Sequence, residues 1–278
     1  MSYINVGTHA GTSLHLNYED YGDGEPIVLI HGYPLDGDSW EKQTTTLLEA
    51  GYRVITYDRR GFGRSSKPAD GYNYDTFASD LDKLMTKLEL TGATLVGFSM
   101  GTGEIARYLG RYGSKRVKRA VFIGCLEPFL LKTEENPEGA VDTDFIDGFS
   151  ASVRKDRYAH FTGFFKDFFN TDTFLGSRLS NEALQHHWIV AGQSGAQASA
   201  KAPYSWIEDF RPDIAAITVP SLIIHGTADN ILPIDATARR FAKMLPEAKF
   251  VEIEGAPHGL LWTHADEVNA PLLEFLKS

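Results

Sequence analysis

Residues 93–101 read ATLVGFSMG, and this stretch decides the fold of the chain. The apolar run 93–96 predicts a buried strand, and residues 102–112 have the apolar spacing of a helix. Between them, the G-x-S-x-G pattern indicates a sharp strand-to-helix turn that presents Ser99 at the end of the strand. A serine in that position is a candidate nucleophile. The alternative is a glycine-rich turn in which the serine has no chemical role.

The rest of the chain alternates strand and helix patterns around this turn. Short runs rich in Val and Ile, or alternating in polarity, predict further strands at residues 13–21 (an edge hairpin strand), 26–30, 52–57, 120–124, 221–225 and 249–253. Helical spacing of apolar side chains marks three faces, at Phe77, Leu81, Leu84 and Leu88, at Phe241 and Leu245, and at Val268, Leu272 and Phe275. This alternation predicts an α/β fold with a mostly parallel sheet flanked by helices.

Residues 128–212 interrupt the alternation. They contain no strong strand pattern, and they hold a cluster of phenylalanines within residues 161–169. We expect a mainly helical insertion over the carboxyl ends of the strands, so that residues 1–127 and 213–278 form the α/β core and the insertion forms a helical cap. The small-residue run 191–202 is compatible with a helix or with a flexible loop.

The composition narrows the classes of function. The chain has 278 residues and a formal net charge of −10, from 27 basic and 37 acidic residues, which argues against nucleic acid and anionic membranes as partners. Cys125 is the only cysteine, so an intrachain disulfide is impossible, and we do not expect a cysteine-based metal site. Apolar runs of membrane-spanning or signal-peptide length are absent from the sequence. We therefore expect a cytoplasmic protein.

A serine nucleophile needs a histidine base, and we identify His258 as the candidate. The base must lie within hydrogen-bond reach of the hydroxyl, and the expected chain order is serine, acid, histidine. His258 lies in the loop GAPHG, directly after the predicted strand 249–253. The competing histidines are His31, His186, His187, His225 and His264. Two of them, His31 and His225, end strands as His-Gly, and we expect them to make structural hydrogen bonds.

The candidate acid is Asp229, which follows the predicted strand 221–225 directly. A carboxylate there can accept the Nδ1–H of His258, fix its tautomer and stabilise the imidazolium as it forms. Glu127, just past the strand 120–124, is the rival acid.

Acyl transfer also needs backbone donors aimed at the developing oxyanion. We expect these donors to be the N–H of Met100, the residue after the nucleophile, and the N–H of Tyr33 in the loop HGYP at residues 31–34. Residues 58–66 contain closely spaced glycines but lack the third glycine and the following helix of a nucleotide-binding loop. That stretch predicts a turn that organises the loops around the site.

An apolar substrate pocket should lie beside the nucleophile. The candidate lining residues are Leu126 and Ile231, which follow two strand ends, and Trp206 of the insertion. Ordinary core packing is the alternative for each of them, because large apolar side chains are mostly buried.

Five stretches are distinctive when they are taken together: HGYPLDGDSW at 31–40, YDRRGFGRSS at 57–66, VGFSMGTGE at 96–104, HGTADNILP at 225–233 and EGAPHGLLWTHADEVN at 254–269. They resemble the cofactor-free haloperoxidase and perhydrolase branch of the α/β-hydrolases. That branch includes bacterial non-heme chloroperoxidases and bromoperoxidases, aryl esterases and γ-lactamases. The similarity extends into the insertion through LEPFLLKTEENPEGA at 126–140 and WIEDFRPDI at 206–214.

This resemblance implies an α/β-hydrolase fold with Ser99, Asp229 and His258 as a catalytic triad and Tyr33 and Met100 as the oxyanion donors. It also implies that the enzyme needs no cofactor and no metal. The assembly it implies is a homo-oligomer, with a trimer favoured.

The chemistry implied by the resemblance is acyl transfer. Ser99 attacks an ester, a lactam or a carboxylic acid to form an acyl-enzyme, and water then releases the acid. Hydrogen peroxide releases a peracid instead, which oxidises halide in solution. One alternative is an esterase or γ-lactamase in which the peroxide chemistry is incidental. A second is a non-catalytic, ligand-binding protein on the same fold.

Overall fold

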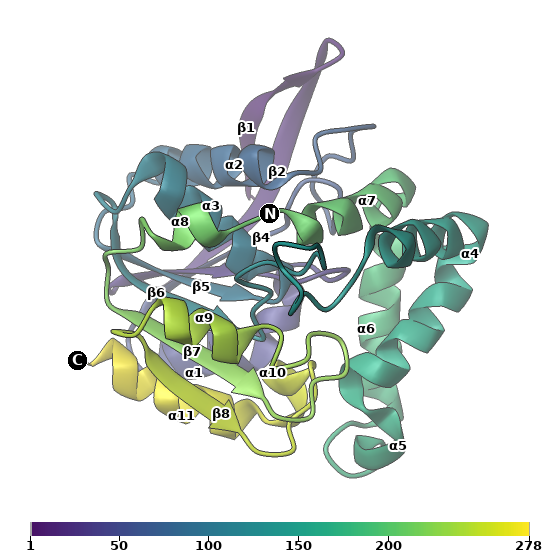
Figure 1. Ribbon diagram of the computed structural model, residues 1–278. Helices are drawn as coiled ribbons and strands as arrows, with labels where there is room; N and C mark the ends of the chain where they lie inside the picture. Colours follow the sequence, from purple (N-terminus) through teal and green to yellow (C-terminus); the bar gives the residue numbers. More distant parts are fainter. Residues whose placement is uncertain (1, 278) are drawn as a thin grey trace.

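The computed structural model describes residues 2–277, and these residues form one mixed sheet covered by helices (Figure 1). The strand order is β1-β2-β4-β3-β5-β6-β7-β8. All pairs from β4 to β8 are parallel, whereas β2 pairs antiparallel with both β1 and β4. The strands are β1 Ser2–His9, β2 Thr12–Tyr21, β3 Pro26–Ile30, β4 Arg53–Tyr57, β5 Ala93–Phe98, β6 Val117–Ile123, β7 Ser221–Gly226 and β8 Lys249–Ile253.

The seven strands predicted from the sequence are all present. The central strands β5 and β7 are buried at every position, as expected for parallel strands with helices on both faces. The prediction that residues 13–21 form the edge strand is wrong, because β1 pairs outside β2 and takes the edge. In β1 the buried Ile4 and Val6 alternate with exposed neighbours, so a short period-two signal was available. The β1–β2 hairpin projects beyond the helices at the top of Figure 1.

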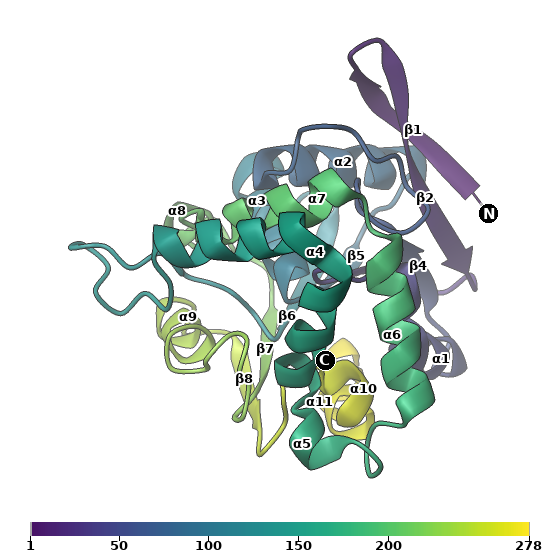
Figure 2. The same ribbon diagram turned by 90° about the vertical axis from the view of Figure 1, so that its right-hand side faces the viewer.

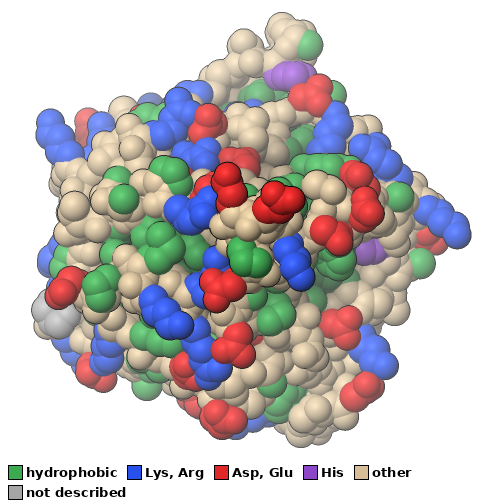
Figure 3. Space-filling view, viewed as in Figure 1, with side chains coloured by type: hydrophobic (Ala, Val, Ile, Leu, Met, Phe, Trp, Pro, Cys, Tyr) green, Lys and Arg blue, Asp and Glu red, His purple; other side chains and the backbone are tan. Residues whose placement is uncertain are grey.

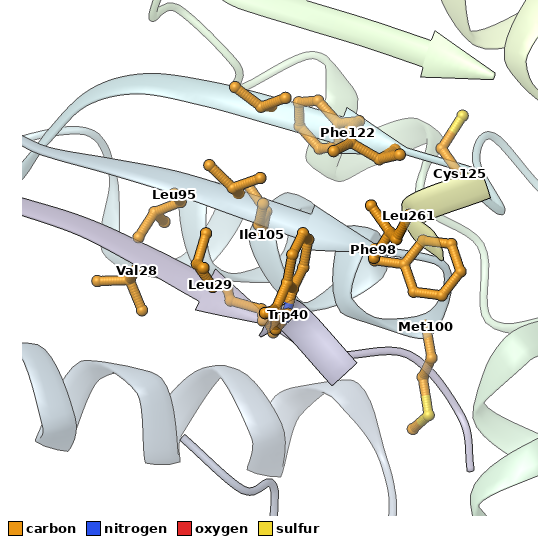
Figure 4. Packing of buried hydrophobic residues seen from close by; sticks show 14 of the residues in the cluster. Val28, Leu29, Trp40, Leu95, Phe98, Met100, Ile105, Phe122, Cys125 and Leu261 are labelled. Atoms are coloured by element: carbon orange, nitrogen blue, oxygen red, sulfur yellow. The ribbon is translucent and has the colours of Figure 1, made fainter. Parts of the chain in front are cut away.

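Helices cover both faces of the sheet. On one face α2 and α8 both pack against α3, and on the other face α1 packs against α11 (Figures 1 and 2). The helices of the core are η1 Gly37–Trp40, α1 Glu41–Glu49, α2 Tyr74–Lys87, α3 Met100–Tyr112, α8 Arg211–Ile214, α9 Ala238–Met244, α10 Leu260–Thr263 and α11 Ala265–Leu276. Figure 4 shows side chains of β3, β5 and β6 packed together with Trp40 and Ile105, which lie in η1 and α3.

The chain between β6 and β7 is helical over most of its length. Its helices are α4 Thr143–Phe169, α5 Thr171–Phe174, α6 Asn181–Gln193, α7 Ala196–Lys201 and η2 Ala202–Ile207. Helix α4 is broken at Asp156, whose φ of −161° and ψ of 92° are not helical and whose carboxylate accepts from the N–H groups of Tyr158 and Ala159. The flexible-loop alternative for residues 191–202 is wrong, since these residues end α6 and form α7. The division into a core and a cap of residues 128–212 stays a prediction.

Within residues 2–277, none of the helices combines the length and the apolar character that a membrane crossing requires.

Candidate active site

The turn between β5 and α3 holds Ser99 in a strained backbone conformation. Its φ of 52° and ψ of −122° are rarely adopted by a residue with a side chain. The N–H of Ser99 donates to the carbonyl of Ile123 at 2.8 Å, and the carbonyl of Ser99 accepts from the N–H and the hydroxyl of Thr102 at 2.9 and 2.7 Å. These bonds on both sides of the residue hold the serine at the end of the strand.

The two glycines of the pattern allow this turn to close. A Cβ on Gly97 would lie 2.6 Å from the carbonyl oxygen of Gly101, and a Cβ on Gly101 would lie 2.2 Å from the carbonyl oxygen of Ile30. Both distances are too short for a carbon atom. Only glycine at these positions lets α3 begin directly against the ends of β3 and β5.

The three predicted triad side chains meet at the carboxyl ends of the strands. The Ser99 Oγ lies 2.8 Å from Nε2 of His258, and Nδ1 of His258 lies 2.6 Å from Oδ2 of Asp229. The serine is 7% exposed, and the imidazole is fully buried. The hydroxyl can therefore lose its proton to a base that is itself oriented by a carboxylate.

The carboxylate of Asp229 is held by several donors. Its Oδ1 accepts from the N–H groups of Ile231 and Leu232 at 2.9 and 2.8 Å, and its Oδ2 faces the imidazoles of His258 and His225. Burial alone would raise the pKa of this carboxyl, but the two imidazoles outweigh burial and hold its pKa below the usual range. Asp229 is therefore ionised at neutral pH.

The rival acid, Glu127, lies in a different environment. It is fully buried, and neither of its carboxyl oxygens has a hydrogen-bond partner among the residues that the structure describes. Burial raises the pKa of this carboxyl from 4.5 to about 8. At pH 7 it is mostly protonated, so it cannot serve as the anionic partner of His258.

Replacing Glu127 should change how stability depends on pH. Between about pH 4.5 and pH 8 the unfolded chain ionises this group while the folded protein keeps the proton, so stability falls as the pH rises through that window. At pH 7 the lost stability is about 3 kcal/mol. Glu127→Gln should therefore be more stable than wild type at pH 7 and equally stable below pH 4.5, measured by urea unfolding. Parallel pH dependences for the two proteins would contradict this reading of Glu127.

The predicted oxyanion donors flank the serine. Met100 is the first residue of α3, and the first N–H groups of a helix have no carbonyl to bond within the helix. The loop that carries Tyr33 passes close to the nucleophile, since a Cβ on Gly32 would lie 2.9 Å from the Cβ of Ser99. The placement suits two donors that converge on one oxygen atom.

A buried ion pair connects the loop that contains Tyr33 to α3, the helix that follows Ser99. The Nε of Arg59 lies 2.7 Å from Oε2 of Glu104 in α3, and both side chains are almost completely buried. Arg59 also donates from Nη2 to the carbonyl of His31 at 2.8 Å and from its backbone N–H to Nε2 of His31 at 2.9 Å. Burial and the nearby guanidinium lower the pKa of His31 well below its ordinary value, so this imidazole is neutral and accepts. The stretch 58–66 thus organises loops of the site, as its sequence predicts.

Breaking this ion pair on one side should be costly. Arg59→Met leaves the Glu104 carboxylate buried without its cation and should lower the free energy of unfolding by about 3–5 kcal/mol. The double variant with Glu104→Gln should recover much of that loss, because no unpaired charge then remains. Urea unfolding of both variants tests this. Strictly additive losses in the double variant would show that the pair does not act as a unit.

A model of the α/β-hydrolase fold family matches residues 25–265 of this chain. The chain belongs to the α/β-hydrolase family. A Synechocystis protein provisionally named as a non-heme chloroperoxidase is 56% identical over 277 residues, and the match covers 100% of both chains. The bifunctional esterase/perhydrolase DCH of Acinetobacter calcoaceticus is 33% identical over 268 residues, with 94% of this chain and 95% of the relative covered.

The same family branch is found among solved structures. The crystal structure of a bromoperoxidase from Bacillus anthracis has a TM-score of 0.95 and 44% identity, and the match covers 100% of this chain and 99% of that one. Together with the sequence relatives, it places this α/β-hydrolase in the non-heme haloperoxidase branch of the family. The expected α/β-hydrolase fold, with its mostly parallel sheet flanked by helices, is confirmed.

A mostly apolar cavity of about 460 Å³ lies between the helices of the insertion and the loop that follows β7. Trp206 and Ile231, two of the three predicted pocket residues, line it. The third, Leu126, is buried outside this lining, and its N–H points to the hydroxyl of Thr102 at 3.4 Å. The side chain of Tyr33 packs 5.0 Å from Trp206, between ring centroids, and therefore joins the cavity wall to the oxyanion loop.

Two phenylalanines that the sequence analysis did not assign to the site flank the imidazole of His258. The ring centroids of Phe98 and Phe168 lie 5.1 and 5.0 Å from that of His258. The carbonyl of Phe168 also accepts from the N–H of Gly259 at 2.7 Å, which anchors α4 beside the histidine loop. The phenylalanine cluster of the insertion was the available signal, but the cluster alone could not indicate which ring meets the imidazole.

Within residues 2–277, no group of three or more His, Cys, Asp or Glu side chains is arranged to hold a metal ion.

Proposed function

We propose that this serine hydrolase is a perhydrolase and esterase that forms its acyl-enzyme on Ser99. The observation that carries the proposal is the unbroken line of hydrogen bonds from the Ser99 hydroxyl through His258 to the ionised Asp229. The apolar cavity lined by Trp206 and Ile231, which the ring of Trp206 connects to Tyr33 of the predicted oxyanion loop, suits a small ester or carboxylic acid with an apolar group. The names of the relatives, non-heme chloroperoxidase and bifunctional esterase/perhydrolase, support this substrate class.

The first half of the reaction acylates the enzyme. Nε2 of His258 takes the proton from the Ser99 hydroxyl as its oxygen attacks the carbonyl carbon of the ester. The N–H groups of Tyr33 and Met100 donate to the oxygen that becomes negative, and Asp229 stabilises the imidazolium. The imidazolium then gives its proton to the departing alcohol, and the acyl group stays on the serine.

The second half transfers the acyl group to a small nucleophile. His258 takes a proton from water or from hydrogen peroxide, and the attacking oxygen replaces the serine oxygen on the carbonyl carbon. Water yields the carboxylic acid, whereas peroxide yields the peracid. In solution the peracid transfers one oxygen atom to halide, so that peracid, halide and a proton give carboxylic acid and hypohalous acid. This route needs no redox cofactor on the protein.

We also propose that the protein is a cytoplasmic homo-oligomer, with a trimer favoured by the resemblance of its sequence to this branch. Large apolar side chains are exposed on the insertion, among them Phe145, Tyr158 and Ile189, and such side chains suit a contact between copies. On the face drawn in Figure 3, acidic and basic side chains are interspersed.

Removing members of the triad tests the assigned roles. Ser99→Ala should lower kcat for an aryl ester by about 10⁴-fold or more and leave thermal unfolding close to that of wild type. Asp229→Asn should lower kcat by about 10⁴-fold, because the amide favours the wrong tautomer of His258. Glu127→Gln is the matched control and should keep nearly full activity. Loss of activity in Glu127→Gln, with Asp229→Asn active, would mean that Glu127 is the acid.

Dependence on a carboxylic acid tests the peroxide chemistry. With peroxide and bromide, bromination of a reporter should require added acetate or an ester, because the oxidant is the peracid formed from the acyl-enzyme. Ser99→Ala should remove the acetate-dependent part. Bromination that persists without any carboxylic acid would contradict the peracid route. Ester hydrolysis without acetate-dependent bromination would leave an esterase or γ-lactamase.

A further inference from the structure

A second histidine contacts the carboxylate of Asp229, at the same oxygen that faces His258. Nε2 of His225, the next-to-last residue of β7, lies 3.2 Å from Oδ2 of Asp229 and 2.9 Å from the carbonyl oxygen of Leu232. Both neighbours are acceptors, so Nε2 must carry the hydrogen, and it shares that hydrogen between them. His225 is fully buried, which removes water as a competing partner.

The other ring nitrogen of His225 faces a thiol. Nδ1 lies 3.8 Å from Sγ of Cys125, which is fully buried just after β6. Burial raises the pKa of the Cys125 thiol well above its ordinary value, so the sulfur keeps its proton and can donate to Nδ1. A series of polar contacts thus runs from the thiol of Cys125 through His225 to Asp229. A second series runs from the hydroxyl of Ser99 through His258 to the same carboxylate.

The arrangement surrounds the carboxylate with four donors. Oδ1 of Asp229 accepts from two backbone N–H groups, Oδ2 accepts from Nδ1 of His258, and Nε2 of His225 lies 3.2 Å from the same Oδ2. The backbone bonds fix one oxygen only. Rotation of the second oxygen away from His258 would break the contact with His225, and so the buried imidazole holds the carboxylate in the plane that the catalytic base needs.

We propose that His225 is a positioning residue for the catalytic acid, and that it limits how strongly Asp229 binds the protonated form of His258. This inference rests on the proposed function, because it assigns His225 to the same triad. Loss of this one contact to the charged carboxylate should lower the rate by about tenfold, which corresponds to about 1.4 kcal/mol.

Other titratable groups near this chain of contacts are accounted for. Glu252 of β8 lies opposite His225 in the sheet register, but its carboxylate is paired with Arg239 at 2.6 Å. Glu127 lies close enough to Cys125 to affect its thiol when ionised, but at neutral pH this carboxyl is mostly protonated and therefore mostly uncharged. Around His258 itself, the neighbouring rings of Phe98 and Phe168 carry no charge. The direction in which the pH profile of activity moves when His225 is replaced therefore depends on Asp229 and its two neighbouring imidazoles.

The expected sign distinguishes positioning from a structural role. Without the N–H of His225, the carboxylate of Asp229 has one donor fewer and attracts protonated His258 more strongly. At low pH, kcat/KM falls because His258 becomes protonated, and we call this falling part of the pH profile the acid limb. The acid limb should then move to higher pH. A loss of packing alone would lower activity or stability without moving that limb.

The test compares the pH profiles of full-length variants on one aryl ester. His225→Met removes the donor at similar volume and should lower kcat/KM about tenfold and move the acid limb to higher pH. His225→Gln places an amide N–H near the position of Nε2 and should restore the wild-type limb. Cys125→Ala removes only the contact at Nδ1 and should leave the limb in place.

Three outcomes would overturn the inference. The first is a wild-type profile for His225→Met, and the second is a loss of activity in both His225 variants with an unmoved limb. The third, from nitrogen-15 NMR of the wild-type protein, is a proton on Nδ1 of His225 instead of Nε2, and this readout does not require any variant to fold. Ser99→Ala in the same assay distinguishes a failure of the proposed function from a failure of the inference about His225. Esterase activity that remains in Ser99→Ala would contradict the proposed function.

Discussion

The close approach of Gly101 to the carbonyl of Ile30 is the constraint from which the geometry of the site follows. No side chain fits between the start of α3 and the end of β3, and so the nucleophile helix begins directly against the oxyanion loop. Ser99 then lies in a backbone conformation that hydrogen bonds to Ile123 and Thr102 hold in place. The folding of the rest of the sheet stabilises this strained turn, which would not persist alone.

Three buried carboxyl groups near the carboxyl ends of the strands differ in their partners. Asp229 has imidazole and backbone donors and is ionised. Glu127 has no such partner among the described residues and holds its proton, with its pKa raised to about 8. Glu104 is paired with Arg59 and joins α3 to the oxyanion loop. The donors around each carboxyl group, and not the type of residue, therefore decide which of them is ionised and suited to be the acid of the proposed triad.

The sequence predicted the parts of this arrangement that are local. The G-x-S-x-G turn, the short buried strands and the chain order of serine, acid and histidine are readable from spacing, and they led to Ser99, Asp229 and His258. Contacts between distant segments were not readable. Residue types alone do not show that His225 shares the carboxylate of Asp229, or that Phe168 packs on His258. The edge strand β1 was missed because its two buried residues give too short a pattern.

The most direct test of the central claim is a crystal structure of the enzyme after inactivation by a small organophosphonate. The account predicts one adduct per chain, on Oγ of Ser99. One phosphoryl oxygen should lie within hydrogen-bond distance of the N–H groups of both Tyr33 and Met100, with His258 between the adduct and Asp229. An adduct on another residue, or a phosphoryl oxygen that points away from both N–H groups, would contradict the account.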